Sequence, residues 1–461
     1  MNEITAWSAV ETAQKIRERE VSCTEVTKAH LDFVELANPV LNAIVESDPK
    51  QALATAAEYD NNWKAEGLPP LYGVPVTTKI NVDQAGSATS NGLPALTENI
   101  ATEDSPVVAN LKQDGAIIIG RTNTPEFSLR WFTSNPLHGL THNPWHPDIT
   151  PGGSSGGAAA AVAVGMGCIA HGNDLGGSLR YPATCCGVAT IRPSMGRIAT
   201  HNPSHPERPP FTHAMSVQGP IARTIADVRL GLNSMAKRSS LDPLWTNSQG
   251  NNEEKKRRWK IGWFIDAFDD GVDADVMAAT ASAVSALKEA GHKLIEMPPP
   301  RALDAATIWG DMLFTETRIM AGESIQTMGS PEIAGVFEAY GTFYDELNTK
   351  GLLQAMQQRM EIQRLWSQMF DDIDVFLLPV SGQKPFLNDQ DVKSPETIPD
   401  IMRAQRFLYL VNVLGLPAAT VPVGVYDGMP LGVQLIGAMH DDAVCLDVAE
   451  ALERAVKFEK L

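Results

Sequence analysis

The hydrophobic and polar positions in the first half of the chain predict helices that alternate with buried strands. Apolar residues recur at helical spacing through Val34, after Ser-x-x-Glu patterns at Ser8 and Ser22 that are typical of helix N-termini. Apolar runs typical of buried strands follow at residues 71–80 and 116–120, with a short helix predicted between them. A helix, a glycine stop and an apolar strand in succession indicate a sheet covered by helices.

The second half of the chain also alternates between predicted helices and strands, except in one segment without apolar periodicity. Residues 237–258 lose apolar periodicity and are predicted to form a surface loop. Residues 299–370 are predicted to be mostly helical. The other predicted elements are strands at 260–264, from 293, at 374–380 and at 418–425, and helices after Thr224, over 274–290 and over about 442–457. We therefore predict one large α/β domain over residues 1–461, without a linker that would divide it.

Composition and charge restrict the classes of partner. Hydrophobic residues make up 43% and charged residues 20% of the chain, as in ordinary globular proteins. The formal net charge of -18 argues against nucleic acid or an anionic membrane surface as the primary partner. The basic run KKRR at 255–258 has polar and acidic neighbours, so we interpret it as part of a solvated linker. The longest apolar run, 158–170, is too short to span a bilayer.

The cysteines, the first residues and the histidines indicate the compartment and argue against a metal site. Five cysteines lack metal or redox spacing, and an odd number suits a reducing compartment. The first residues lack the pattern of a secretory signal, so we expect a cytoplasmic protein. His138, His142 and His146 recur every four residues, but Gly139 and Pro144 interrupt the helix that would align them.

Two serines framed by glycines, Ser154 and Ser178, are the strongest candidates for chemistry. Glycine neighbours let the backbone approach a substrate closely and aim its N–H groups at one point. The segment 152–156 also fits the G-x-S-x-G pattern of α/β-hydrolases, although the three prolines before it do not suit the strand that this pattern needs. A Ser-His-Asp esterase that uses Ser154, and a binding protein without catalytic activity, therefore stay open as alternatives.

Lys79 is the candidate base. It closes an otherwise apolar strand, where an ammonium group is costly to bury unless it is paired. Such a lysine favours its neutral form, which can act as a general base. The alternative is a lysine whose stem is buried and whose ammonium reaches solvent at the end of the strand.

Lys79, GGSSGG at 152–157 and GNDLGGSLRYPA at 172–183 together resemble the amidase signature family. The separation of 24 positions from Ser154 to Ser178 (178 minus 154) and the order of lysine, first serine and second serine match that family. The resemblance extends over TNTPEF at 122–127, QGPIARTIADV at 218–228 and LGLPAATVPVG at 414–424. It implies the family's fold, a single domain with a central mixed β-sheet covered by helices on both faces.

The resemblance implies a serine amidohydrolase that cleaves a carboxylic amide C–N bond and releases a carboxylate and ammonia or an amine, without a metal or organic cofactor. Ser178 would form the acyl-enzyme, Ser154 would relay protons after a cis peptide bond from Gly153, and Lys79 would be the general base. The implied oxyanion-hole and supporting residues are Leu175, Gly176, Gly177 and the N–H group of Ser178, with Ser155, Asp174 and Arg180 in support.

This chain departs from the family pattern at three positions near these motifs. Ile80 follows the lysine where an acidic residue is usual, Asn173 stands where threonine is usual, and Thr190 takes a glycine position. None of these changes removes an implied catalytic residue. They are expected to alter loop geometry and the fit of the substrate.

The family's layout divides the chain into a core motif region of about 70–230 and a variable, substrate-side region of about 237–400. It assigns substrate contacts to Trp131, Phe132 and His138 and to the aromatic segment 337–344, which suggests a small amide with an aryl or otherwise apolar group. A glutaminase subunit of a tRNA-dependent amidotransferase is the alternative within the family, although the loop 129–136 lacks the small residues expected for that role. A homodimer is one assembly that we consider.

Overall fold

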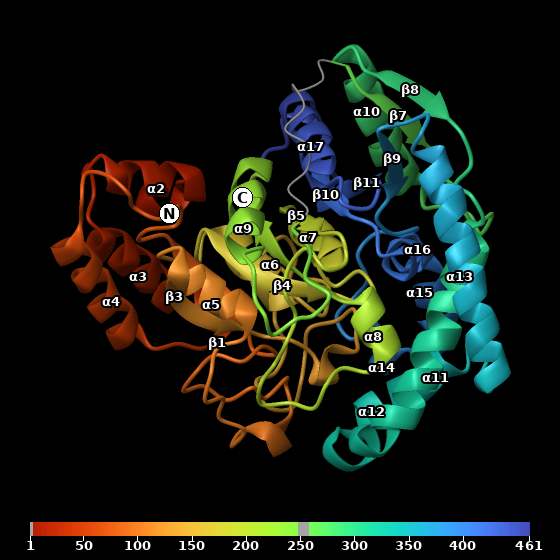
Figure 1. Ribbon diagram of the computed structural model, residues 1–461, viewed down its shortest axis with the longest axis horizontal. Coiled ribbons are helices and arrows are strands. Elements are labelled where there is room, and N and C mark those ends of the chain that lie inside the picture. Colours follow the sequence, from red (N-terminus) through yellow and green to blue (C-terminus); the bar gives the residue numbers. More distant parts are fainter. Residues whose placement is uncertain (1–2, 248–257) are drawn as a thin grey trace.

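One mixed β-sheet of eleven strands forms the centre of the molecule (Figure 1). The computed structural model describes residues 3–247 and 258–461, so nearly all of the KKRR run lies outside the described residues. The strand order is β1-β3-β2-β4-β6-β5-β10-β11-β9-β7-β8. The strands are β1 (Ile44–Glu46), β2 (Pro75–Lys79), β3 (Ile117–Thr122), β4 (Ile169–Asp174), β5 (Ala189–Arg192), β6 (Val217–Ala222), β7 (Lys260–Trp263), β8 (Lys293–Glu296), β9 (Val375–Pro379), β10 (Ala418–Tyr426) and β11 (Met429–Gly437).

Helices cover both faces of this sheet. They are α1 (Glu3–Ala6), α2 (Ala9–Arg17), α3 (Cys23–Leu41), α4 (Pro49–Asn62), α5 (Pro106–Gln113), α6 (Gly156–Val164), α7 (Arg180–Cys186), α8 (Pro210–Met215), α9 (Ile225–Met235), α10 (Ala274–Glu289), α11 (Ala302–Met328), α12 (Pro331–Gly341), α13 (Thr349–Met369), α14 (Gln390–Lys393), α15 (Ile398–Ala404), α16 (Arg406–Leu414) and α17 (Asp442–Val456). Short 3₁₀ turns occupy Pro94–Leu96, Glu126–Ser128 and Pro395–Thr397. Among the described residues, none of these helices has the length and apolar composition needed to cross a membrane.

Three clusters of apolar side chains form the core, and alternate residues of a strand join different clusters. The first cluster includes α9, α10 and α17, the second α11, α13 and α16, and the third α3 and α6. In β9, Val375 and Leu377 belong to the first cluster, whereas Phe376 and Leu378 belong to the second. Because successive side chains of a strand point to opposite faces, the sheet is buried on both sides. The predicted α/β domain with a mixed, doubly covered sheet is confirmed.

The predicted elements match the structure, and buried strands that lack an apolar run were missed. The predicted strand 71–80 contains β2, and the predicted helices over 299–370 are α11, α12 and α13. Ser22 forms the predicted capping box with Glu25. The strands β4 and β6, with sequences IAHGND and VQGPIA, contain glycine, proline and polar residues and so lack the apolar run that reveals a buried strand.

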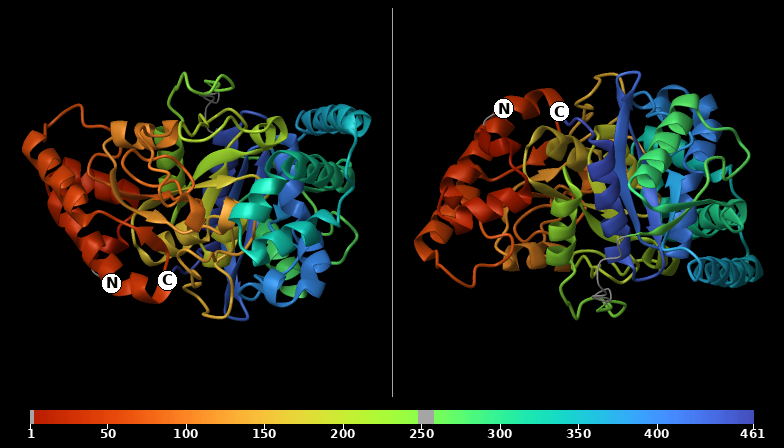
Figure 2. Two further views of the ribbon diagram at one scale, coloured as in Figure 1. Left: turned by 90° about the horizontal axis from the view of Figure 1, so that it is seen from below. Right: turned by 90° about the horizontal axis from the view of Figure 1, so that it is seen from above.

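The sheet topology brings the two main motifs to one place. Strands β2 and β4 are parallel neighbours, so their carboxyl ends lie at the same edge of the sheet. Lys79 ends β2, and Asn173 and Asp174 end β4. Ser154 comes just before α6, and Ser178 lies between β4 and α7. Figure 2 shows this central part of the molecule between the N-terminal helices at one end and the helices of residues 300–370 at the other.

Candidate active site

Lys79 lies in a fully buried cluster of neutral oxygen atoms. Its Nζ atom is 2.7 Å from Ser154 Oγ, 2.8 Å from Asn173 Oδ1 and 3.2 Å from Ser155 Oγ. Burial lowers the pKa of Lys79 well below its ordinary value, and the charge of Asp174 opposes this shift only in part. The shift favours the neutral amine, and the Nζ atom lies within hydrogen-bonding distance of a serine hydroxyl.

The glycines around Ser154 let its loop pack against another stretch of backbone. The peptide bond between Gly153 and Ser154 is cis, as the family resemblance implied. A Cβ atom at Gly153 would lie 2.5 Å from the carbonyl oxygen of Arg130, so only glycine permits this contact. The loop of Ser154 is thereby held against residues 130–132, which also border the cavity described below.

Asp174 holds the loop that carries Ser178. Its carboxylate accepts hydrogen bonds from the backbone N–H groups of Gly177 (2.9 Å) and Leu179 (3.3 Å) and pairs with Arg180 at 3.0 Å, all of them buried. Burial by itself would raise the pKa of this carboxyl group, but the charge and hydrogen bonds of Arg180 hold the pKa well below its ordinary value. Asp174 and Arg180 therefore form a buried charged pair that fixes the conformation of the Ser178 loop.

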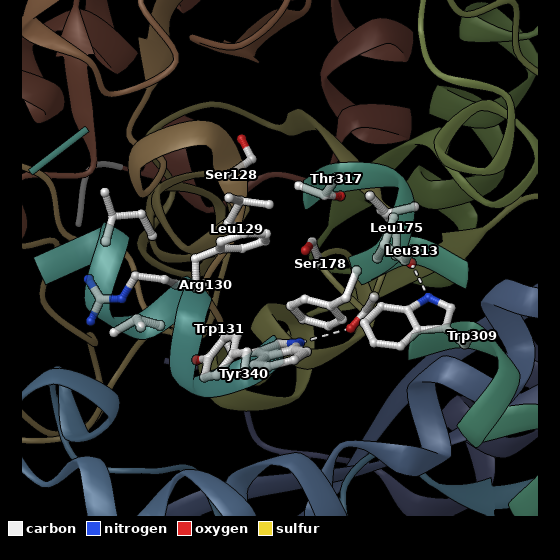
Figure 3. Close-up of a pocket in the computed structure, with 15 residues that line it drawn as sticks. Ser128, Leu129, Arg130, Trp131, Leu175, Ser178, Trp309, Leu313, Thr317 and Tyr340 are labelled. Atoms are coloured by element: carbon white, nitrogen blue, oxygen red, sulfur yellow. Dashed lines mark hydrogen bonds between the residues drawn. The ribbon is translucent and has the colours of Figure 1, made fainter. Parts of the chain in front are cut away.

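Two tryptophans fix the same loop from the side of the cavity (Figure 3). Trp309 Nε1–H donates to the carbonyl oxygen of Leu175 at 3.0 Å, and Trp131 Nε1–H donates to that of Gly176 at 2.8 Å. In a trans peptide the C=O and N–H groups point in opposite directions. The N–H group of Gly176 consequently points away from Trp309.

The position of Gly177 differs from the sequence-based expectation. Its N–H group was expected to join the oxyanion hole, but it donates to Asp174 Oδ1. Gly177 instead has a φ of 98°, and a Cβ atom there would collide with the side chain of Leu408. The glycine is needed for the turn and for the close packing on α16.

Ser178 opens onto a small aromatic cavity with a volume of about 50 Å³ (Figure 3). Trp131, Trp309, Phe314, Phe337 and Tyr340 form much of its wall. The other residues that line it are Ser128, Leu129, Arg130, Leu175, Gly176, Leu313, Thr317, Ile333 and Val336. Loop 128–131, the Ser178 loop, α11 and α12 together build this cavity.

Only Trp131 of the three residues assigned to substrate contact lines this cavity. The Phe132 side chain is fully buried and packs on Phe386, with 6.0 Å between the ring centroids. Its ring is enclosed by core side chains such as Phe386 and therefore does not form part of the cavity wall. His138 is held in a loop outside the cavity. Its backbone N–H donates to Asn135 Oδ1, and its backbone carbonyl oxygen accepts from Asn42 Nδ2–H.

A buried ion pair supports the part of the cavity wall that Arg130 and Tyr340 form. Arg130 donates to both carboxylate oxygens of Asp391, at 2.8 and 2.5 Å, and to Asp389 at 2.9 Å, while the Tyr340 hydroxyl donates to Asp391 at 2.9 Å. The guanidinium charge is thus neutralised within the wall, which leaves the cavity suited to an uncharged group. Sequence reasoning missed Asp391 and Trp309, because they are distant from the motifs and lie in segments without a chemical signature.

No group of three His, Cys, Asp or Glu side chains within residues 3–247 and 258–461 is arranged to hold a metal ion. His171 lies on β4, the strand next to that of Lys79, and both of its ring nitrogens have hydrogen-bond partners other than the Lys79 amine. Its Nδ1 accepts from the backbone N–H of Lys79 at 3.4 Å, and its Nε2 lies 2.7 Å from Gln218 Oε1. Burial lowers the pKa of His171 to about 4, so its neutral form predominates at pH 7.

Comparisons with known proteins identify the family. The sequence model of the Amidase family matches residues 25–446. An indoleacetamide hydrolase of Bradyrhizobium diazoefficiens is 44% identical over 97% of this chain and 86% of that protein. An acylamidase of Rhodococcus erythropolis is 31% identical over 97% of this chain and 94% of that protein. The crystal structure of a bacterial aryl acylamidase of the amidase signature family, 26% identical, superposes with a TM-score of 0.84 over 97% of this chain and 96% of that one. The chain therefore belongs to the Amidase family and is an amide hydrolase of the amidase signature type.

Proposed function

We propose that the protein hydrolyses a primary arylacetamide, such as indoleacetamide, to the carboxylate and ammonia through an acyl-enzyme on Ser178. The observation that carries this proposal is the buried Lys79 amine at 2.7 Å from Ser154 Oγ, beside an aromatic cavity that Ser178 lines. The aromatic wall suits an indole or phenyl ring, and the name of the 44% identical relative supports this substrate.

Catalysis begins with proton transfer through the two serines. Ser178 Oγ attacks the amide carbonyl carbon while its proton passes to Ser154, whose own proton passes to Lys79. Backbone N–H groups of Leu175, Gly176 and Ser178 stabilise the negative charge that develops on the carbonyl oxygen. Trp309 and Asp174 keep this loop in the conformation that presents those groups.

The same relay then runs in reverse. The C–N bond breaks as the proton returns from Lys79 through Ser154 to the leaving nitrogen, and ammonia departs. A water molecule gives a proton to the relay, attacks the acyl carbon and releases the carboxylate. Ser178 recovers its proton, so the enzyme returns to its starting state.

Covalent labelling tests the assignment of these residues. A fluorophosphonate probe, followed by intact mass measurement and peptide mapping, should place one adduct on Ser178. Lys79→Met should slow labelling by about 100-fold or more, because the general base is lost. Lys28→Met, at an exposed lysine paired with Asp32, is the matched control and should label at the wild-type rate. An adduct on Ser154 that forms without Lys79 would contradict the proposal and favour the esterase alternative.

Substrate competition tests the choice within the family. The proposal predicts a far higher kcat/KM for indoleacetamide than for glutamine, because the charged groups of glutamine find no partner on the aromatic wall. Preferred hydrolysis of glutamine, together with a co-purifying partner chain, would support the amidotransferase reading instead.

We further propose that the enzyme is cytoplasmic and forms a homodimer. The five buried free thiols suit a reducing compartment. The exposed apolar residues Ile319 and Met320 of α11 and Leu353 and Met360 of α13 are candidate contacts between the two copies. Cell fractionation and light scattering after size exclusion test the two statements, and a monomer at micromolar concentration would contradict the second.

A further inference from the structure

We propose that Asn173 is a positioning residue that directs the lone pair of Lys79 toward Ser154 by accepting one of the lysine N–H groups. This inference rests on the proposed role of Lys79 as the general base. It concerns a position where this chain departs from the usual threonine of the amidase signature motif.

The carboxamide of Asn173 is held in one orientation. Its Nδ2–H donates to Asn81 Oδ1 at 3.0 Å, and Asn81 Nδ2–H donates to Ser128 Oγ at 3.0 Å. The Ser128 hydroxyl donates onward to Asn91 Oδ1 at 2.8 Å. Every donor in this series points away from Lys79, so the group that Asn173 presents to the lysine is its oxygen, which can only accept.

With Lys79 in its neutral form, the hydrogen bonds around its Nζ atom have one consistent arrangement. A neutral amine has two N–H groups and one lone pair, and one N–H donates to Asn173 Oδ1 at 2.8 Å. Ser155 directs its own proton to the backbone carbonyl oxygen of Asn173, so its Oγ accepts the second N–H at 3.2 Å. The lone pair remains for Ser154, whose Oγ is the closest of the three at 2.7 Å. In this neutral form Ser154 donates to Lys79, which is the direction that the proton relay requires.

Asn173 provides this acceptor without a negative charge. The ionised groups around Lys79 are engaged with other partners: Asp174 of β4 with Arg180, and Arg121 of β3 with Glu46. His171 of β4 is neutral at pH 7, since burial lowers its pKa. A carboxylate at position 173 would be the first negative charge in direct contact with the lysine, and it would favour the ammonium form.

The pH dependence of Ser178 labelling by the fluorophosphonate probe tests this role. Asn173→Asp should move the acid limb of the labelling rate to higher pH by about 1–3 units, because an adjacent opposite charge raises the lysine pKa by that amount. Its alkaline plateau should stay within about threefold of wild type, since the carboxylate still accepts the N–H group. Asn81 contacts Asn173 rather than Lys79, so Asn81→Asp places the same charge one hydrogen bond farther from the lysine. The acid limb of this variant should therefore move less.

Variants without the charge complete the test. Asn173→Leu removes the acceptor, so its plateau should fall about tenfold or more with no alkaline shift of the acid limb. Asn173→Thr restores an oxygen acceptor and should recover most of the plateau. Thermal unfolding of each variant separates loss of fold from loss of rate, and Asn173→Thr is the variant least disruptive to β4.

The outcomes distinguish this inference from the function on which it rests. An acid limb of Asn173→Asp at the wild-type pH, with labelling that still requires Lys79, would overturn the role of Asn173 and leave the proposed function intact. Labelling of the wild-type enzyme that is indifferent to Lys79 would overturn the proposed function itself. An alkaline shift in Asn173→Asp that Asn173→Leu does not share supports both.

Discussion

At the scale of single residues, the salt bridge between Asp174 and Arg180 lies in the protein interior, with both side chains fully buried. Asp174→Asn removes the negative charge and leaves the Arg180 guanidinium without its charged partner in the protein interior. The expected loss is about 3–5 kcal/mol of unfolding free energy, because an uncompensated buried charge remains. Urea denaturation measures it, and Asp400→Asn, which breaks the exposed pair with Arg403, should cost no more than about 0.5 kcal/mol. Equal losses in the two variants would contradict this account of the buried pair.

The same pair makes stability depend on acid. The pKa of Asp174 is lower in the folded protein than in the unfolded chain, so the unfolded chain binds its proton first as pH falls. The stabilisation is therefore complete above about pH 5 and is lost as pH falls below the unfolded pKa of about 4. Unfolding free energies at pH 7 and pH 3 should differ more in wild type than in Asp174→Asn. An identical acid response in the two proteins would exclude Asp174 as a source of the dependence.

Sequence reasoning at this scale selected residues whose local pattern is unusual. Lys79 and Ser154 were found because a lysine in an apolar strand and a serine among glycines are unusual on their own, and the structure places them together. The contact between Asn173 Oδ1 and Lys79 was not predicted, because it depends on the register of β4 beside β2. Phe132 was misassigned to the pocket because an aromatic residue suits a core and a cavity equally well.

At the scale of elements, α11 positions the Ser178 loop through one hydrogen bond. Trp309→Phe keeps an aromatic ring but loses the N–H donor to Leu175. We expect kcat to fall about tenfold, because the adjacent N–H group of Gly176 is no longer aimed at the oxyanion. Steady-state kinetics measures this effect. Trp366→Phe, in α13 and away from the cavity, loses a similar bond to Pro300 and should lower stability without lowering kcat.

Helix α12 forms a wall of the cavity and is anchored at its N-terminus by Glu126. The Glu126 carboxylate accepts from the N–H and the hydroxyl of Ser330, both at 2.7 Å. Glu126→Ala should free this end of the helix and raise KM about fivefold, the equivalent of a capping interaction of about 1 kcal/mol. Asp60→Ala removes an analogous carboxylate from the start of α3 and should lower stability with no change in KM. A similar KM in both variants would contradict the anchoring role.

Element prediction failed at β4, which lies beside β2 in the sheet, and at β6, which lies beside β4, for a physical reason. Strands β4 and β6 are fully buried, yet glycine, proline and polar residues take up much of their length. They are stable because each pairs with neighbours on the sheet and because small residues let helices approach closely. Gly219 of β6 shows this, since a Cβ atom there would lie 2.5 Å from Leu179 Cδ1. Such strands are defined by their partners rather than by their own apolar pattern.

At the scale of the whole molecule, the eleven-stranded sheet joins three core clusters that the sequence could not delimit. An α/β domain was predictable from alternating helices and strands. The order of the strands was not, because β11 lies between β9 and β10, and β5 pairs with β10 across more than 220 residues. Pairing between segments so distant in sequence depends on the complete fold and carries no local signal.

The five cysteines report whether these clusters unfold together. Cys23 and Cys186 belong to the third cluster, Cys168 and Cys445 to the first and Cys185 to the second, and all five are buried. Burial raises the pKa of Cys23 to about 12 and that of Cys168 to about 11, so the reactive thiolate is scarce in the native protein.

We therefore expect iodoacetamide to leave the native protein unmodified and to label all five thiols at one common rate in intermediate urea. A single domain opens as one cooperative unit, so intact mass spectra should show only unlabelled and fully labelled chains. Cys23 of α3 and Cys186 of α7 share the third cluster, which makes them the control for separate opening of that cluster. Chains labelled at these two positions alone would show that the third core cluster opens independently, and the prediction of one cooperative domain over the described residues would then be wrong.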